Sequence, residues 1–291
     1  MMKNNEIMFS IIIPHFDIPQ LLQRLIASIP QRDDIQIIVV DDNSHEGKKP
    51  KLIEHKGLEL IFLDASQSKG AGKARNVGIG KAKGKYIIFA DSDDFFESSF
   101  WNIVDKELEN KNVDILYFKD RAVDSETLEP ICPRNKNNTY IDGYLSGKKN
   151  ADDTIRFFHI VPWGKVFKGD FIRQKKIQFD EVIASNDVMF STKTGALANK
   201  INVSKYTMYV VTRRLSSLVN SDTKESMRCR FEVAIRQNLY LRSIGKQYYS
   251  FNLIRPIANS LNFGMSELLW YLKQVIFYKV NPFAFVERLL K

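Results

Sequence analysis

Residues 87–96 read IIFADSDDFF, an apolar run that ends in three carboxylates within four positions. Alternate side chains of a strand share a face, and the interior of a sheet does not tolerate two charges there. The carboxylates must therefore emerge where the strand ends, so that Asp91 and Asp93 can converge on one hard cation. Mg²⁺ and Mn²⁺ prefer such oxygen ligands, commonly one or two carboxylates completed by phosphates. The alternative is a polar turn that caps the following helix, because Asp and Ser are good N-caps.

The first 120 residues alternate strand-like and helix-like segments. Near-continuous apolar runs predict strands over residues 9–14, 35–42, 58–64, 85–90 and 113–118. Apolar residues at helical spacing and helix-compatible segments predict helices over residues 18–30, 71–82 and 98–110. Buried strands separated by helices indicate an α/β fold with a mostly parallel sheet covered on both faces. In such sheets ligands bind beyond the carboxyl ends of the strands.

Acidic residues follow several of these predicted strands. Asp17 lies just past the first, and Asp41 and Asp42 end the second in the segment VVDDNS. This second acidic strand end favours metal and nucleotide chemistry over a simple helix cap for residues 91–94. The segment SKGAGKARNVGIGKAKGKY, residues 68–86, supplies the complementary positive charge. Its small residues allow close backbone approach, and Arg75 can form forked bonds to a phosphate or a base edge.

Motif and composition exclude several classes of protein. The glycines of residues 68–86 match neither GxGxxG nor GxxxxGK[ST], so neither a dinucleotide site nor a P-loop is supported. The 291 residues are 44% apolar and 26% charged, which excludes disordered, collagen-like and disulfide-scaffold proteins. Cys132 and Cys229 lack metal-ligand companions at short spacing, which argues against a zinc site. No run resembles a signal peptide or a membrane span, so we expect a cytoplasmic protein.

The net charge of +9 requires an acidic partner, either nucleic acid, anionic lipid or a polyanionic substrate. Residues 230–291 carry nine Lys or Arg against three Glu, which leaves +6 in the last fifth of the chain. We predict that residues 221–291 are mostly helical, after a long surface connection over residues 124–153. Aromatic and basic residues in these helices are typical of helices that lie on the inner face of a membrane. The alternative is a helical hairpin packed on the α/β domain or on a second copy in a homodimer.

Four segments, taken in this order, resemble glycosyltransferase family 2, whose members have the GT-A fold. They are IIIPHFD (11–17), VVDDNS (39–44), GAGKARNVGI (70–79) and FADSDD (89–94). Downstream, VPWGKVFKGDFI (161–172) and ASNDVMF (184–190) look like acceptor-side segments of bacterial polysaccharide-forming members. The resemblance covers roughly residues 8–218. It implies a nucleotide-sugar-binding half over residues 1–123, an acceptor-binding half over 124–220 and a C-terminal helical extension over 221–291.

The resemblance also implies roles for individual residues. On the donor side these are Phe16 and Asp42 at the base, Arg75 at the nucleotide, Asp91 near the ribose and Arg214 at the leaving diphosphate. Asp93 would bind the divalent cofactor, Mn²⁺ or Mg²⁺. Asp187 matches the general base, and Trp163 and Lys165 would lie in the acceptor region.

The chain departs from the family pattern at three places. Asn186 stands before Asp187 where Glu is usual, and Ser216 stands where a Gly is common. His15 and Asp17 replace the commoner Thr and Asn of the first motif. Because like charges raise a carboxyl pKa, the loss of the Glu neighbour should lower the pKa of Asp187. None of these changes removes a residue that the chemistry needs.

The resemblance implies an inverting, metal-dependent glycosyltransferase, most simply a hexosyltransferase of bacterial capsule or O-antigen assembly. It would transfer sugar from a nucleotide-sugar donor, by analogy a UDP-sugar, to a glycan or lipid-linked acceptor. A haloacid-dehalogenase-type phosphatase is disfavoured because Asp94 and Phe95 follow Asp93, where that family needs Thr or Val. A nucleotidyltransferase is disfavoured by the segment around Asp187. A basic nucleic-acid- or lipid-binding module leaves the acidic motifs unexplained, so we expect no nucleic-acid partner.

Overall fold

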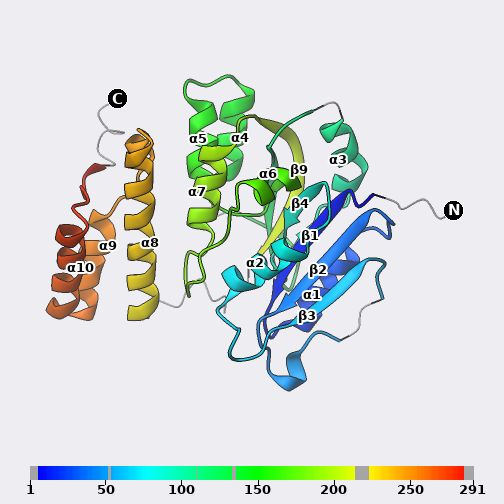
Figure 1. The fold of residues 1–291 in the computed structure, drawn as a ribbon, viewed down its shortest axis with the longest axis horizontal. Helices are drawn as coiled ribbons and strands as arrows, with labels where there is room; N and C mark the ends of the chain where they lie inside the picture. Colours follow the sequence, from blue (N-terminus) through cyan, green and yellow to red (C-terminus); the bar gives the residue numbers. More distant parts are fainter. Residues whose placement is uncertain (1–5, 52–53, 110, 133–135, 214–222, 285–291) are drawn as a thin grey trace.

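A mixed sheet flanked by helices forms the body of the protein in the computed structural model (Figure 1). The structure describes residues 6–51, 54–109, 111–132, 136–213 and 223–284. In this part of the chain the strands follow the order β3-β2-β1-β4-β8-β6-β9-β5, with β7 paired to β6. The C-terminal helices lie to one side, away from the N-terminus.

The first half of the sheet is parallel, as the apolar runs predict. It contains β1 (Phe9–His15), β2 (Ile35–Asp41), β3 (Leu58–Phe62) and β4 (Tyr86–Phe89). β1 pairs with β2 on one side and with β4 on the other, so Ile11 lies between Ile37 and Ile88. Because the chain forms β2 and β3 before it crosses back to β4, the direction of strand order changes beside β1. Such a switch point leaves a crevice at the carboxyl ends of the strands.

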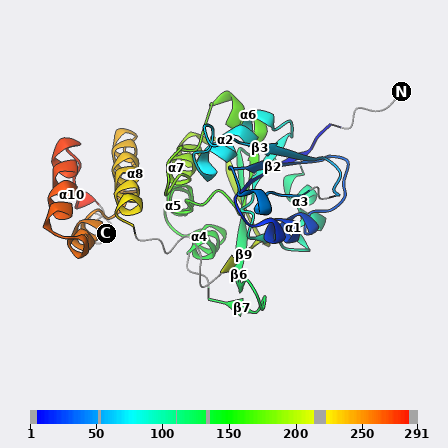
Figure 2. The same ribbon diagram turned by 90° about the horizontal axis from the view of Figure 1, so that it is seen from below.

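Alternate residues of β1 enter two separate cores, one on each face of the sheet. Ile11 and Ile13 pack in the core covered by α1 (Pro19–Ala27) and α3 (Phe100–Leu108). Ile12 packs in the opposite core, which includes Ala74 of α2 (Ala71–Lys81). Figure 2 shows α1 and α3 on one side of the strands and α2 on the other. The continuous apolar run of β1 is therefore explained by burial on both faces.

The second half of the sheet mixes strand directions. β8 (Lys165–Lys168) joins β4 to β6 (Ile115–Asp124) and is antiparallel to both. β9 (Ile201–Arg213) runs parallel to β6, and the short β5 (Phe95–Phe96) pairs antiparallel with β9. The sheet thus brings the end of β9 next to the segment that follows β4. This proximity matters for the site described below.

The predicted long surface connection over residues 124–153 is wrong. This stretch contains β7 (Pro130–Ile131), α4 (Asn137–Leu145) and the start of α5 (Ala151–Phe158). Local sequence gives α4 little helical signal, because most of its residues are polar or glycine. Tertiary contacts stabilise it instead: Ile141 is fully buried, and the side chain of Asn137 donates a hydrogen bond to Asp120 at 3.0 Å.

The C-terminal region is helical, as predicted. The elements are α8 (Lys224–Ser243), η3 (Gln247–Tyr249), α9 (Ile254–Asn259), η4 (Ser260–Phe263) and α10 (Met265–Phe277). The hydroxyl of Thr223 caps α8 by accepting a hydrogen bond from the amide of Ser226 at 3.1 Å. Across the described residues, no helix combines the length and apolar character needed to cross a membrane.

The helix α8 attaches this region to the α/β body. Val233 packs against Val188 and Met189, at the start of α7 (Val188–Leu197). Two ion pairs reinforce the contact, Arg236 with Asp180 at 3.0 Å and Lys246 with Asp153 at 2.5 Å. α8 therefore packs on the side of the body that carries α5 and α7 (Figure 1). Of the alternatives for the C-terminal helices, packing on the α/β domain holds for α8.

Gly78 and Gly80 of α2 provide a matched test of how tightly this helix packs on β1. A Cβ at Gly78 would overlap the side chain of Ile12, whereas a Cβ at Gly80 would enter open space. Overpacking of this kind costs about 1–3 kcal/mol, while Ala in an exposed helix position gains about 1 kcal/mol over Gly. We expect Gly78→Ala to have a lower free energy of unfolding than Gly80→Ala in urea titrations. Equal stability of the two variants would show that α2 shifts freely on β1.

Candidate active site

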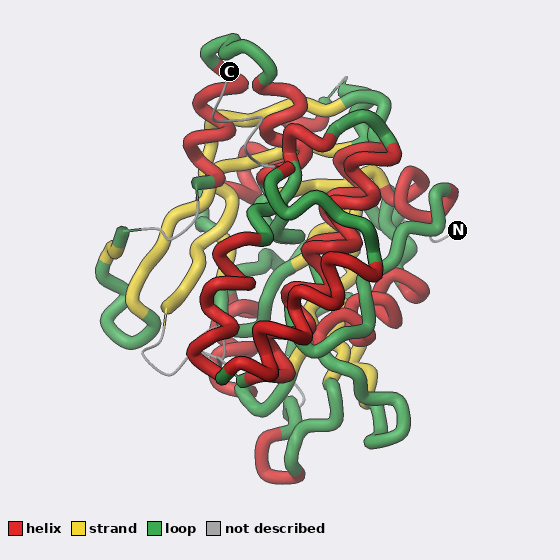
Figure 3. Tube along the Cα trace, turned by 90° about the vertical axis from the view of Figure 1, so that its left-hand side faces the viewer, coloured by secondary structure: helices red, strands yellow, loops and turns green. Residues whose placement is uncertain are grey.

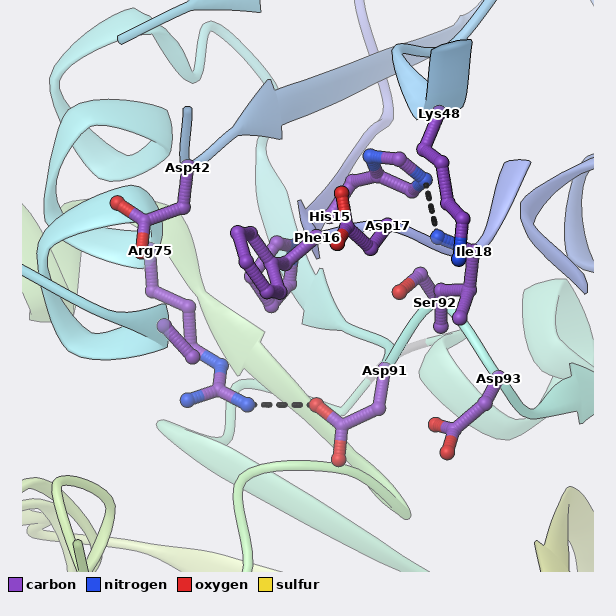
Figure 4. A pocket seen from close by; sticks show the side chains of 12 residues that line it. His15, Phe16, Asp17, Ile18, Asp42, Lys48, Arg75, Asp91, Ser92 and Asp93 are labelled. Atoms are coloured by element: carbon purple, nitrogen blue, oxygen red, sulfur yellow. Dashed lines mark hydrogen bonds and ion pairs between the residues drawn. The ribbon is translucent and has the colours of Figure 1, made fainter. Parts of the chain in front are cut away.

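A cavity of about 440 Å³ opens at the carboxyl ends of β1, β2 and β4, at the switch point of the sheet (Figure 4). Ten of its twelve lining residues come from the four segments that carry the glycosyltransferase resemblance, and the other two are Ile18 and Lys48. The lining residues are Pro14, His15, Phe16, Asp17, Ile18, Asp42, Lys48, Ala71, Arg75, Asp91, Ser92 and Asp93. The structure thus brings together five of the predicted donor-side and metal residues: Phe16, Asp42, Arg75, Asp91 and Asp93.

A buried hydrogen-bond network supports the wall formed by the end of β1. The Nδ1 of His15 lies 2.7 Å from the carboxylate of Asp41, which also accepts from the hydroxyl of Ser44 at 2.6 Å. Ser44 in turn accepts from the amide of Asp17 at 2.9 Å. The network fixes the backbone on both sides of Phe16, whose ring is 46% exposed and faces the cavity (Figure 4).

Asp42 and the first turn of α2 form the adjoining wall. The carboxylate of Asp42 is buried and accepts a hydrogen bond from the amide of Gly70 at 2.8 Å. Gly70 has φ of +80°, a left-handed conformation that favours glycine, and it directly precedes the helix. Ala71, the first residue of α2, lines the cavity. The amino end of an α-helix carries partial positive charge, which suits a bound phosphate.

Arg75 connects this cavity to the segment that contains Asp187. Its Nη2 lies 2.5 Å from a carboxylate oxygen of Asp91, and its Nη1 donates to the side-chain oxygen of Asn186 at 2.8 Å. The guanidinium also lies 5.2 Å from the centre of the Phe179 ring, within the range of a cation–π contact. The side chain is only 6% exposed. The two bonds come from two separate nitrogens of a rigid planar fork, whereas a lysine has only one nitrogen.

Gly72 allows α2 to approach the same segment closely. A Cβ at this position would overlap the carbonyl oxygen of Asp180 and would lie 3.1 Å from the Cβ of Asn186. The small residues of the predicted basic segment therefore have a packing role in addition to any role at phosphate. They let the donor-side helix touch the chain just before Asp187.

Backbone contacts hold the loop of residues 91–94 against β9. The hydroxyl oxygen of Tyr209 accepts from the amide of Asp91 at 2.7 Å. The carbonyl of Asp93 accepts from the hydroxyl of Thr212 and from Arg24, each at 2.6 Å. These bonds fix the backbone and leave the carboxyl groups of Asp91 and Asp93 in the lining of the cavity.

Asp94 differs from its acidic neighbours because it is buried rather than in the cavity. Its carboxyl accepts from the amide of Thr212 at 2.7 Å. Burial, together with the charges of Asp93 and Asp91, raises the pKa of Asp94 well above its usual value. Asp94 thus fastens the loop to β9, and of the three carboxylates only Asp91 and Asp93 face the space where a cation and phosphates would lie.

The donor set in the cavity fits a hard divalent ion such as Mn²⁺ or Mg²⁺. Asp93 offers carboxylate oxygens at the rim, and the neighbouring Asp91 is bonded to Arg75. Within the described ranges there is no cluster of three or more His, Cys, Asp or Glu side chains. A hard ion that keeps waters and shares phosphate oxygens needs only one or two protein carboxylates. The residues therefore suit an ion that arrives with a diphosphate better than one held by the protein alone.

Asp187 lies at the amino end of α7, next to Asn186 and half-buried. Burial raises the pKa of Asp187 above its ordinary value, while the positive charge of Arg75 partly opposes this effect. The charge of Asp91 acts in the same direction as burial. Losing a Glu neighbour at position 186 therefore does not leave Asp187 with a low pKa, because desolvation outweighs the missing charge.

Trp163 and Lys165, predicted in the acceptor region, are buried beside the site and do not line the cavity. The indole of Trp163 stacks on the ring of Tyr209, with centres 5.4 Å apart. The Nζ of Lys165 donates to the carbonyl of His159 at 2.6 Å, and burial lowers the pKa of Lys165 to about 7. The predicted donor residue Arg214 lies outside the described residues.

Several lining residues were not singled out by sequence reasoning as site residues. His15, Ser92 and Lys48 belong to this group, and Lys48 comes from η1 (Glu46–Lys48). In the sequence, His15 stands out only because it departs from the family pattern. Ser92 stands out only because it lies between Asp91 and Asp93, two predicted site residues. Asp17, the other departure, pairs with exposed His45 at 2.6 Å at the rim. Lys48 had no signal, since a lysine in a polar loop is normally solvated.

The sheet order, the switch-point cavity and its acidic strand ends define an α/β enzyme with a GT-A-type nucleotide-binding body. The family model described as "Glycosyl transferase family 2" matches residues 10–162. This match spans just over half of the chain, and the protein therefore belongs to glycosyl transferase family 2. The predicted family and fold class are confirmed.

Comparison with solved structures agrees with this assignment. The structure of Staphylococcus aureus TarS residues 1–349 in complex with UDP-GlcNAc matches with a TM-score of 0.70. The match covers 93% of this chain and 81% of that chain at 19% sequence identity. At this identity the likeness shows the shared GT-A fold alone.

The curated relatives that this chain matches are longer proteins. The poly(ribitol-phosphate) beta-N-acetylglucosaminyltransferase TarS of S. aureus is 25% identical over 219 residues, which are 71% of this chain and 36% of TarS. The uncharacterized glycosyltransferase EpsJ of Bacillus subtilis is 25% identical over 225 residues, 75% of this chain and 64% of EpsJ. The chain thus spans between about one third and two thirds of the length of these relatives.

Tyr209 offers a test of how the loop of residues 91–94 is held. Tyr209→Phe removes the hydroxyl oxygen that accepts from the buried amide of Asp91, and an unpaired buried donor costs about 1–3 kcal/mol. We expect this variant to unfold at lower urea concentration than wild type. Tyr206→Phe on the same strand is the control, because Tyr206 is exposed. Equal unfolding midpoints for the two variants would show that the bond does not support the loop.

Proposed function

We propose that the protein is an inverting, metal-dependent transferase that moves a sugar from a UDP-sugar to a hydroxyl of a glycan or lipid-linked acceptor. The observation that carries the proposal is the position of Arg75. Its guanidinium bonds Asp91 in the cavity and Asn186 next to Asp187. A donor in the cavity and an acceptor beside Asp187 would then lie on either side of one positive group.

In this proposal residues 1–123 bind the donor. The exposed ring of Phe16 stacks on the base, and Asp42 accepts a hydrogen bond from it. Asp91 lies near the ribose, within reach of the arginine that also contacts the nucleotide. The choice of uridine is supported by the UDP-GlcNAc complex of TarS and by the UDP-Glc donor named for the Escherichia coli glucosyltransferase WfgD. WfgD is 25% identical over 115 residues, 39% of this chain.

The leaving diphosphate is the group whose charge must be stabilised. Asp93 would hold a divalent ion, which supplies positive charge to the diphosphate oxygens. Arg75 would stabilise the same charge from a fixed, largely desolvated position, where a preorganised cation is most effective. Arg214 is proposed to act in the same way from the segment that follows β9.

Asp187 would act as the general base within residues 124–220. Its carboxylate takes the proton of the acceptor hydroxyl as that oxygen attacks the anomeric carbon from the face opposite the diphosphate, which inverts the configuration. Burial raises its pKa, which makes it a better base than a solvated aspartate. Trp163 and Lys165, which are buried, would support the residues that contact the acceptor.

The acceptor is proposed to be a growing bacterial polysaccharide or its lipid-linked precursor. TarS is named for poly(ribitol-phosphate), and WfgD for GlcNAc-diphosphoundecaprenol, a lipid-linked sugar. A capsule or O-antigen pathway would supply acceptors of this kind. Such acceptors would place the protein in the cytoplasm, at the inner face of the cell membrane.

A thermal-shift panel tests the donor and the metal together. We expect UDP and UDP-sugars to raise the melting temperature in the presence of Mn²⁺ and to have little effect without it. Ligand at about 100 times its dissociation constant adds about 2.7 kcal/mol of stability, enough to detect. A shift with another nucleoside diphosphate alone would replace uridine in the proposal. No shift with any nucleotide and metal would contradict the donor site.

Asp187→Asn tests the general base. The amide cannot accept the proton, and general bases contribute typically about 10²–10⁴-fold to rate. We expect turnover to fall by this factor, while the UDP-dependent thermal shift persists because the change lies outside the cavity. The loss is measured as the transfer of radiolabelled sugar from the nucleotide sugar that gives a thermal shift to a lipid-linked acceptor. Near-native turnover would rule out Asp187 as the base.

The pH dependence should respond to position 186. A Glu there would add negative charge beside Asp187 and would draw Arg75 toward itself, and both effects raise the pKa of Asp187. Because the base must be deprotonated, transfer is lost as pH falls through that pKa. We therefore expect Asn186→Glu to move the acid limb of the kcat profile upward by about 1 pH unit. Asn186→Gln, of equal size and neutral, is the control, and coincident limbs would refute this electrostatic account.

A further inference from the structure

The helix α10 and the turn before it expose a continuous apolar stripe. Leu261, Met265, Leu269, Leu272 and Ile276 recur at intervals of four, four, three and four, the spacing of one helix face. Phe277, the last residue of α10, and Tyr278 and Phe283 beyond it extend the exposed surface. All eight side chains are between 40% and 75% exposed. We call this set the α10 stripe.

The opposite face of α10 already has its partners. Tyr271 is buried, and its ring lies 4.4 Å from the ring of Phe231 of α8. Glu267 is buried as well and accepts two hydrogen bonds from Arg228, at 2.9 and 2.7 Å. α10 thus carries apolar side chains on its outer side as well as on its inner side, and among the described residues only the inner side is covered. An exposed apolar surface of this kind is typical of a site that binds a partner or a membrane.

Among the residues that the structure describes, the position of α10 in the fold leaves the α10 stripe exposed. α10 contacts α8, α9 and η4, while α8 lies between it and the α/β body. Figure 1 shows α10 at the outer side of the C-terminal helices, and Figure 3 shows these helices toward the viewer when the molecule is seen from that side. The α10 stripe therefore faces away from the sheet and from the cavity.

Charge distinguishes between the candidate occupants of this surface. Residues 251–284 contain three basic side chains, Arg255, Lys273 and Lys279, and all three are exposed. Their one acidic residue is Glu267, which is buried against Arg228. A second copy on the same face would bring like charges together, because a two-fold interface repeats the same patch. An anionic surface would meet this patch with opposite charge.

We propose that the α10 stripe docks on the surface of an anionic lipid bilayer, with Lys273 and Lys279 at the phosphate level. Aromatic and aliphatic side chains enter the interface, and basic groups bind the acidic headgroups, as in helices that lie in a membrane surface. Membrane docking would bring the protein to the lipid-linked acceptor of the proposed function. Only this biological purpose rests on the proposed function, and the docking itself does not. Because α8 packs on α7 and also contacts α10, docking through α10 would turn the side of the α/β body that carries α7 toward the membrane.

Flotation of the full chain with vesicles tests the proposal. We expect the protein to float with vesicles of phosphatidylcholine and phosphatidylglycerol, and about 30-fold less with phosphatidylcholine alone, since each of the two lysines near the surface contributes about 1 kcal/mol. Leu269→Glu with Ile276→Glu should abolish flotation with either kind of vesicle. Lys273→Gln with Lys279→Gln should lower binding to the anionic vesicles about 30-fold and leave binding to the neutral vesicles unchanged.

A control variant and the oligomeric state separate the outcomes. Phe62→Glu with Leu145→Glu places the same charges at exposed apolar positions on the α/β body and should float like wild type. Melting curves and the UDP thermal shift of each variant check that the fold and donor site are intact. Equal flotation of the stripe variant and wild type would overturn the proposal. A wild-type dimer that Leu269→Glu with Ile276→Glu dissociates, without vesicle binding, would assign the stripe to a second copy and also overturn it.

Discussion

A buried guanidinium, that of Arg75, connects three segments that are distant in the chain: α2, the end of β4 and the residues before α7. Its two arms point to groups in different halves of the protein, and the ring of Phe179 lies against its face. Its position, charge and shape all matter, since the guanidinium presents its donors in a fixed planar fork, whereas a lysine ammonium is a single point charge. This one side chain lines the cavity, opposes the rise in the pKa of Asp187 and joins α2 to the segment before α7.

The parallel half of the sheet could be predicted because both of its faces are buried, which leaves continuous apolar runs such as residues 9–14. The strand ends could be predicted for the complementary reason, since Asp91 and Asp93 cannot remain inside the sheet. Other elements have no local signal. β5 and β7 are two residues long, and α4 is helical because Ile141 and Asn137 reach partners elsewhere in the fold.

The candidate site shows the same division. Residues whose chemistry is visible in a motif, such as Asp42 and Asp93, lie in the cavity, although their roles stay proposals. What the sequence could not reveal is which neighbouring carboxyl is buried. Asp94 is covered by β9, a strand more than 100 residues later, and this burial raises its pKa, whereas Asp93, with the identical side chain, lines the cavity. Lys165 likewise lies under the site instead of in it, because β8 is an inner strand.

The close approach of Gly72 to Asp180 limits how the sequence of this protein can change during evolution. Every missense change of a glycine codon adds at least a Cβ, and at position 72 that atom would overlap a backbone carbonyl. A change at this position would force apart the two surfaces that Arg75 holds together. Residues in exposed loops can vary without such an overlap, whereas no substitution of Gly72 avoids it. New specificities in this lineage would therefore have to arise around a fixed joint between the two halves.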